Sequence, residues 1–96
     1  MNDYEDEDFE WDLGKARYNY RKHDVSFEEA ATIFRDWLLL VFPDDEHSDE
    51  EERLINIGKS KQGRILTVIT TERGIKSRLI SARKANAEER TLYELQ

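Results

Sequence analysis

The sequence predicts an α+β fold, in which an antiparallel sheet of four to five strands follows a hairpin of two helices and precedes a C-terminal helix. Three observations indicate it: a helix-capping motif at Ser26, apolar–polar alternation after residue 52, and short turn sequences between the alternating segments. Helices that precede an antiparallel meander gather on one side of the sheet. A chain of 96 residues can bury one modest core, so residues 1–96 are expected to form a single domain.

The first predicted strand is short and lies around residues 9–11, where two aromatic residues alternate with an acid. Asp12 can cap a helix over residues 13–23. Asp24 ends this helix in a tight turn, because Asp tolerates a left-handed backbone.

The second helix begins at a capping box. The Ser26 side chain can accept a hydrogen bond from the backbone of Glu29, and the Glu29 side chain can reach back to the backbone of Ser26. The helix runs to about residue 35, and its apolar residues fall at i, i+3, i+4 and i+7 on one face: Phe27, Ala30, Ala31 and Phe34. A connection this short makes the two helices a hairpin.

The remaining strands fill the second half of the chain. The apolar run 37–42 ends at Pro43, and its continuous apolarity predicts a strand buried on both faces. An acidic loop follows at 43–51. Alternating segments separated by turns then predict three strands, at 52–59, 64–70 and 75–82. A terminal helix is expected over 86–95.

Charge is unevenly distributed along the chain, whose net charge is −7. Residues 1–12 contain seven acids and no base, residues 43–52 contain seven more acids, and residues 53–90 contain ten Lys or Arg against three Glu. Local potential steers binding, so a polyanion such as RNA can meet the basic half. The alternative is that both kinds of segment are solvated surface. The acidic residues 1–8 are expected to be disordered or to shield the basic surface.

Several absences narrow the class of protein. The chain has no cysteine, which excludes disulfides and thiolate chemistry. Its two histidines are 24 positions apart, a poor pattern for metal ligands, so we expect neither a metal site nor a cofactor. No apolar run is long enough to cross a membrane, and no signal peptide is expected. These features favour a cytoplasmic protein that has no membrane partner.

Several different short motifs are spread over the chain from Phe9 to Tyr93. They include Phe9-Glu10-Trp11-Asp12, Lys22-His23, Val25-Ser26-Phe27-Glu28-Glu29-Ala30, His47-Ser48, Thr71-Glu72-Arg73-Gly74 and Ile80-Ser81-Ala82-Arg83. In this order and spacing, the chain resembles the BrnT family, the ribonuclease toxins of a type II toxin–antitoxin pair within the RelE-like superfamily. Two positions differ from the family: Asp24 stands where Gly is usual, and Trp37 stands where Pro commonly follows the Asp.

The resemblance implies a RelE-like fold and a cytoplasmic ribonuclease that needs no cofactor. It also implies a partner antitoxin of the BrnA type, whose DNA-binding domain would bring the complex to operator DNA and repress its own operon. The alternative function is a non-catalytic binding module that only pairs with a DNA-binding protein.

RNA cleavage without a metal uses the ribose 2′-OH as nucleophile and needs a base, an acid for the leaving 5′-oxygen and cations for the charge on phosphorus. His47 is the candidate general acid or base, since an imidazole titrates near neutral pH, or it is a loop histidine that pairs with carboxylates. Glu51 can orient His47, act as the base or be merely solvated. Arg83, where the last strand ends, is the first candidate for the phosphate.

Four further residues are candidate RNA contacts: Arg53, Arg64, Arg78 and Tyr93. Arg53 can hold phosphate or pair with a neighbouring acid. Arg78 shares a strand with Arg83, and their odd spacing puts them on opposite faces unless a bulge intervenes. Tyr93 can stack on a base or donate a proton, or it can simply cover the sheet.

Overall fold

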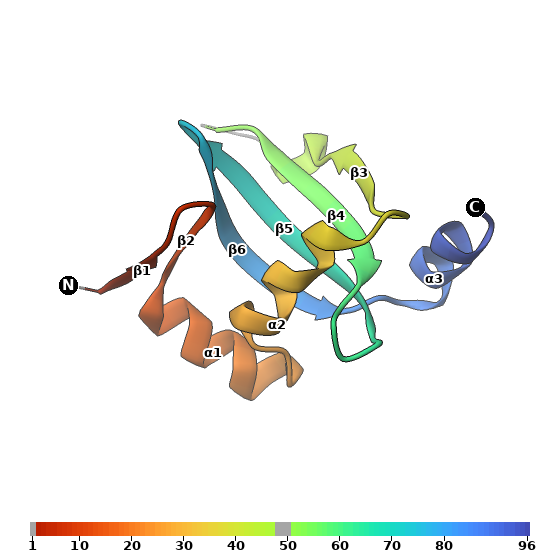
Figure 1. The fold of residues 1–96 in the computed structure, drawn as a ribbon, viewed down its shortest axis with the longest axis horizontal. Coiled ribbons are helices and arrows are strands. Elements are labelled where there is room, and N and C mark those ends of the chain that lie inside the picture. Colours follow the sequence, from red (N-terminus) through yellow and green to blue (C-terminus); the bar gives the residue numbers. More distant parts are fainter. Residues whose placement is uncertain (1, 48–50) are drawn as a thin grey trace.

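The computed structural model describes residues 2–47 and 51–96, which form one six-stranded sheet with helices on both faces (Figure 1). In the spatial order β1-β2-β6-β5-β4-β3, the strands are β1 (Asp3–Glu5), β2 (Phe9–Asp12), β6 (Lys76–Lys84), β5 (Ile65–Arg73), β4 (Arg53–Lys59) and β3 (Leu40–Pro43). The α-helices are α1 (Leu13–His23), α2 (Phe27–Ala31) and α3 (Ala87–Glu94), and two 3-10 helices are η1 (Thr32–Arg35) and η2 (Asp45–His47). The α+β class is therefore confirmed. Part of the predicted acidic loop, residues 48–50, lies outside the described residues.

The sheet is mixed rather than wholly antiparallel, because β2 runs parallel to β6. It also has one strand more than the predicted maximum, since residues 3–5 of the acidic N-terminal segment pair with β2 as strand β1. The ring of Tyr4 stacks on Trp11 with 4.2 Å between the centroids. This apolar contact anchors a strand whose acidic composition suggested disorder or a shielding role.

Helices α1 and α2 cover one face of the sheet and enclose the main core. Asp12 caps α1 by accepting a hydrogen bond from the backbone of Lys15 at 2.7 Å, and Asp24 ends it with a φ of 59°, as predicted. Asn19 ties α1 to β6, since its side-chain amide donates to the carbonyl of Ala82 at 2.8 Å and accepts from the Ala82 amide at 3.0 Å. The buried core residues are Trp11, Val25, Phe27, Ala30, Ile33, Leu66, Val68, Leu79 and Ala82.

Helix α3 lies against the opposite face, so the prediction that the helices share one side is wrong. The Thr67 hydroxyl donates to the Glu89 carboxylate of α3 at 2.9 Å. Thr67 alternates along β5 with Leu66 and Val68, which face the main core, so its side chain points the other way. Helix α3 therefore lies over the end of this second face that carries Thr67, and the cavity described below opens on the same face.

The apolar run 37–42 is not a strand buried on both faces, as its composition suggested. Strand β3 begins only at Leu40, at the edge of the sheet, and the preceding Trp37 is 99% exposed. Leu39 instead packs against the core beside Gly58, where an added Cβ would lie 2.9 Å from the Leu39 Cδ1 atom. Among the described residues, no helix has the length and apolarity needed to cross a bilayer.

Candidate active site

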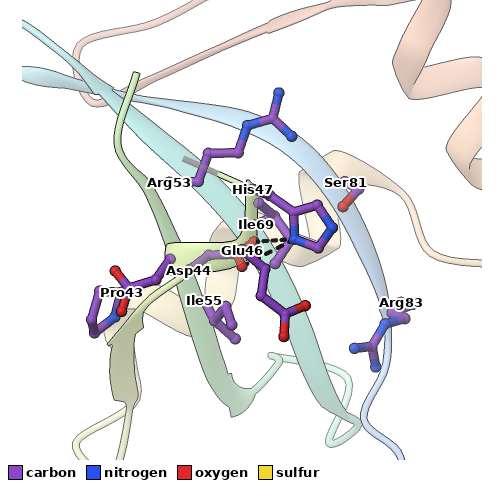
Figure 2. Close-up of a pocket in the computed structure, with 10 residues that line it drawn as sticks. Pro43, Asp44, Glu46, His47, Arg53, Ile55, Ile69, Ser81 and Arg83 are labelled. Carbon is purple, nitrogen blue, oxygen red and sulfur yellow. Dashed lines mark hydrogen bonds and ion pairs between the residues drawn. The ribbon is translucent and has the colours of Figure 1, made fainter. Parts of the chain in front are cut away.

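A cavity of about 640 Å³ opens on the face of the sheet that α1 and α2 leave uncovered (Figure 2). Its floor is a row of residues across three strands, with Ile55 opposite Ile69 and Ile69 opposite Ser81. One wall is the segment that leaves β3, and the opposite wall is the end of β6. The lining residues are Pro43, Asp44, Asp45, Glu46, His47, Arg53, Ile55, Ile69, Ser81 and Arg83. Of the predicted site residues, the cavity therefore collects His47, Arg53 and Arg83.

The imidazole of His47 contacts the carboxylate of Asp44. Its Nδ1 atom lies 3.1 and 3.2 Å from the two carboxylate oxygens of Asp44 (Figure 2). A carboxylate accepts rather than donates hydrogen bonds, so it favours the ring form that carries a proton on Nδ1. Nε2 is then the atom available for proton transfer. The ring itself stays 64% exposed, so substrate can reach it.

Asp44 is well suited to fix this ring because it is fixed itself. Its side chain is only 11% exposed. Its backbone N–H donates to the carbonyl of Arg53 at 2.8 Å, which joins the start of the η2 segment to β4. Sequence reasoning missed this residue as a site member. The signal was the i, i+3 spacing of an acid and a histidine within a short turn, which resembles ordinary loop composition.

Arg83 reaches the cavity from the end of β6, and α3 binds it there. Its two terminal nitrogens donate to the two carboxylate oxygens of Glu89, at 2.7 and 2.9 Å. This hydrogen bonding raises the pKa of Arg83 against the opposing effect of burial. Burial alone would raise the pKa of Glu89, but bonds from Arg83, the Asn86 backbone and Thr67 lower it overall. The Arg83 side chain remains 41% exposed, and a guanidinium has five N–H donors, so some of them can meet a phosphate.

Arg53 enters the cavity from the start of β4, whereas Glu51 does not. The Glu51 carboxylate lies 3.3 Å from Arg73 and faces a separate cavity of about 350 Å³. The suggested roles of Glu51, orienting the histidine or acting as the base, thus have no support from the cavity lining. Glu51 precedes β4, which begins at Arg53, and pairs with Arg73 at the last residue of β5, beyond the row of residues that forms the cavity floor.

Two more candidates, Arg64 and Tyr93, are not among the residues that line the cavity, and both bind acidic side chains of other elements. Arg64 binds the Glu29 carboxylate through its Nε and a terminal nitrogen, and it also donates to the carbonyl of Asp24 at 2.9 Å. The predicted capping box is therefore half formed, because Ser26 caps α2 as expected while the Glu29 side chain turns to Arg64. Neither Arg64 nor Glu29 lines the cavity.

Tyr93 covers the sheet from α3, one of the two alternatives for it. The residue is 6% exposed, and its hydroxyl donates to the carboxylate of Asp36 at 2.5 Å. Burial and this hydrogen bond raise the pKa of Tyr93 to about 12. In this arrangement the hydroxyl is engaged by Asp36, and Tyr93 is not among the residues that line the cavity.

A β-bulge decides where the last two arginines point. Strand β6 has one extra residue, Ile80, between the residues paired with Ile69 and Thr70. Because of it, Leu79 and Ala82 both face the main core although they are three positions apart. The arginines on either side of this stretch therefore share the face that carries the cavity.

Arg78 shares that face with Arg83 but does not line the cavity. Acidic side chains of β1 and β2 bind its guanidinium. The odd spacing predicted opposite faces for the two arginines unless a bulge intervened. The bulge at Ile80 is that exception, and the two side chains share one face. Over residues 2–47 and 51–96, no group of three or more His, Asp or Glu side chains is arranged to hold a metal ion.

Comparison with known families identifies the chain. A sequence model described as "Ribonuclease toxin, BrnT, of type II toxin-antitoxin system" matches residues 11–89. The chain belongs to the BrnT family. Its fold agrees with this assignment: the crystal structure of the Brucella abortus ribonuclease toxin BrnT superposes with a TM-score of 0.62 and 28% sequence identity. That match covers 79% of this chain and 92% of the Brucella chain. No curated protein sequence matches.

Membership in the BrnT family establishes a ribonuclease toxin of a type II toxin–antitoxin system. A toxin of this kind has RNA as its substrate and an antitoxin as its partner. Strand β1 and part of β2 precede the matched residues 11–89, so they lie outside the segment that the BrnT family model describes.

Proposed function

We propose that this BrnT protein is a metal-independent endoribonuclease that uses the ribose 2′-OH as its nucleophile. The proposal is carried by one observation: an oriented imidazole and two guanidiniums from separate elements line a single cavity. His47 comes from η2, Arg53 from β4 and Arg83 from β6. These are the groups needed to move a proton and to stabilise charge on phosphorus.

In the proposed reaction, the 2′-oxygen bonds to phosphorus and the bond to the 5′-oxygen breaks, leaving a 2′,3′-cyclic phosphate. One proton leaves the 2′-OH and another reaches the 5′-oxygen. His47 carries one of them through Nε2, while Asp44 holds Nδ1. We assign the other to Glu46, whose carboxylate lines the same cavity (Figure 2). Arg53 and Arg83 stabilise the negative charge on the phosphate oxygens.

We further propose that the partner is a BrnA-like antitoxin in the cytoplasm, and that operator DNA is contacted only through the toxin–antitoxin complex. A second candidate function is a non-catalytic module that pairs with a DNA-binding protein. One observation favours it: Glu89 already occupies the fork of Arg83, which makes this arginine a structural residue in the free protein.

Purified protein incubated with RNA, with and without a chelator, separates the two functions. We expect cleavage that survives the chelator and yields 2′,3′-cyclic phosphate ends. His47→Ala should reduce the rate by about 100-fold, as removal of a general acid or base typically does. Glu51→Gln, outside the cavity, is the matched control and should cleave at the wild-type rate. Intact RNA with wild-type protein would leave the binding module as the function.

Growth tests address the partner. Expression alone should arrest growth, and co-expression with the neighbouring open reading frame should restore it. His47→Ala and Arg83→Ala should grow without the partner while still binding it. Full toxicity of both variants would show that the catalytic site lies elsewhere.

A further inference from the structure

We propose that the acidic hairpin, defined as strands β1 and β2 with the side chains of Asp3, Glu5 and Glu10, limits the RNA-binding surface beside the cavity. It does so by occupying two cations of β6, Lys76 and Arg78, that RNA phosphates would otherwise meet. This inference rests on the proposed ribonuclease function and assigns residues that set how far RNA extends from the scissile bond.

The first step is that Arg78 lies in line with the cavity. Across the sheet, Arg53 is opposite Thr71, Thr71 is opposite Arg78, and Arg78 is opposite Glu10. Residues opposite one another in a sheet point to the same face, and neighbouring strands are about 4.8 Å apart. The backbone of Arg78 is therefore roughly 10 Å from that of Arg53, a cavity residue. A short stretch of single-stranded RNA spans such a distance.

The second step is that acids already bind these cations. A terminal nitrogen of Arg78 donates to Glu10 at 2.7 Å and lies 3.3 Å from a carboxylate oxygen of Asp3. Lys76 pairs with Glu5 in the same way. The side chains of Arg78 and Lys76 are only 16% and 22% exposed. Three carboxylates thus face two cations, and this end of the face carries a net negative charge.

The third step is that strand β1 lies outside the matched family segment. Asp3 and Glu5 precede residues 11–89, which match the BrnT family model, whereas Lys76 and Arg78 fall inside them. Glu10 lies just before the matched residues and belongs to the motif Phe9-Glu10-Trp11-Asp12. Without the hairpin side chains, the cavity would continue into a basic strand. With them, phosphates approaching this end are repelled, so bound RNA is expected to make fewer phosphate contacts here.

Contacts that do not involve these charges also hold the hairpin. Tyr4 stacks on Trp11, and the backbone N–H of Leu13 donates to the carbonyl of Asn2 at 2.7 Å. Both contacts are on the uncharged side of the hairpin or in its backbone. Isosteric neutral substitutions should therefore remove the acids and leave the strand in place.

The test compares two triple variants of the full chain that remove the same charge. The hairpin variant is Asp3→Asn/Glu5→Gln/Glu10→Gln. The control variant is Glu28→Gln/Glu88→Gln/Glu94→Gln, whose exposed acids are on helices α2 and α3. Binding of a short 2′-O-methyl oligoribonucleotide, which resists attack by the 2′-oxygen, is measured across a salt series, and cleavage of the unmodified RNA is measured in parallel.

We expect the hairpin variant to bind roughly tenfold more tightly at low salt, and the slope of log K against log salt to steepen by about 1.4, for two phosphates at about 0.7 each. The control variant should change much less. Adding Arg78→Gln should remove about half of the gain in the hairpin variant, and the same substitution should have little effect on the otherwise wild-type protein.

Equal gains in the two triple variants would mean that only net charge matters and would overturn the proposal, as would an unchanged salt slope. In either case, RNA cleavage by the wild type leaves the ribonuclease function standing. A wild-type protein that neither binds nor cleaves RNA would overturn both. Circular dichroism checks folding, and Glu10→Gln alone provides a milder variant that should show part of the gain.

Discussion

Glu89 binds both terminal nitrogens of Arg83, at 2.7 and 2.9 Å, and so links the cavity to helix α3. The same carboxylate accepts hydrogen bonds from the Thr67 hydroxyl and from the backbone of Asn86, both at 2.9 Å. It therefore starts α3, attaches the helix to β5 and positions the guanidinium proposed to meet the phosphate. Attachment of the terminal helix and organisation of the site depend on one side chain.

Glu89→Gln should destabilise the protein while freeing Arg83. The amide oxygen can still accept from Thr67, but the charged pair is lost, which we expect to cost about 1–2 kcal/mol in the free energy of unfolding. The released guanidinium should also bind RNA more tightly. Urea denaturation and RNA binding measure the two effects. The neighbouring Glu88→Gln removes an equal charge from an exposed site and should change neither; equal stability of the two variants would contradict the prediction.

Asp44→Asn should lower kcat about tenfold and leave KM nearly unchanged, because it affects the orientation of His47 and not the phosphate contacts. The amide can offer an N–H to Nδ1, which allows the proton to move to Nε2. Nitrogen chemical shifts of the imidazole would report this change of tautomer, which a merely structural role for Asp44 would not produce.

Asp45→Asn is the matched control, since it removes the same charge from the wall of the same cavity. It should cleave RNA at close to the wild-type rate. If the two variants lose equal activity and the imidazole keeps its tautomer, Asp44 acts only through charge or folding.

Acid should destabilise the protein partly through Glu29. Its hydrogen bond with Arg64 holds the pKa of Glu29 below its usual value, although burial opposes this, and Ser60 adds a further bond. A carboxyl group with a lowered folded-state pKa stabilises the protein above its unfolded pKa, and this contribution disappears as the pH falls through the folded value. Glu29→Gln should therefore lose about 2 kcal/mol at neutral pH and show a flatter dependence of stability on pH below about 4.5.

Exposed Glu28, the preceding residue, provides the comparison for that experiment. Glu28→Gln should retain the acid dependence of the wild type. Denaturant midpoints measured from neutral to acid pH distinguish the two, and parallel curves for wild type and Glu29→Gln would show that another carboxyl group dominates.

Tyr93→Phe should separate folding from catalysis. The hydroxyl bond to Asp36 is charged and buried, so its loss should cost about 2 kcal/mol. RNA cleavage at a temperature where the variant is folded should be unchanged, because Tyr93 does not line the cavity. A large drop in kcat with wild-type stability would restore the catalytic reading of this tyrosine. Ultraviolet titration of the wild type should show a phenol with a pKa of about 12.

Elements with strong local signals could be predicted from the sequence. The boundaries of α1 follow from two residues at its ends. The Asp12 side chain caps the first turn, and the left-handed backbone of Asp24 ends the last turn, so both effects are local. The strands β4 to β6 follow from alternation and turns. The family could also be named from the sequence. Each motif alone is weak evidence, but the order and spacing of many motifs together are specific to the BrnT family.

Long-range features could not be predicted. The bulge at Ile80 redirects two arginines, and the sequence around it alternates like any strand. Glu29 sits where a capping box expects it, but an arginine from a distant strand competes for its carboxylate. The parallel pairing of β2 with β6 joins segments far apart in the chain. In each case the deciding partner is tertiary, so local propensity carries no information about it.

His47 lies in η2, between β3 and β4, and β3 is an edge strand of the sheet. Outermost strands fray more readily than central ones because they have a hydrogen-bonding neighbour on one side only. Detachment of β3 would carry the imidazole away while the main core stayed intact. Catalytic competence would then be lost in a sub-global opening, before cooperative melting, and amide hydrogen exchange should be faster in β3 than in β5.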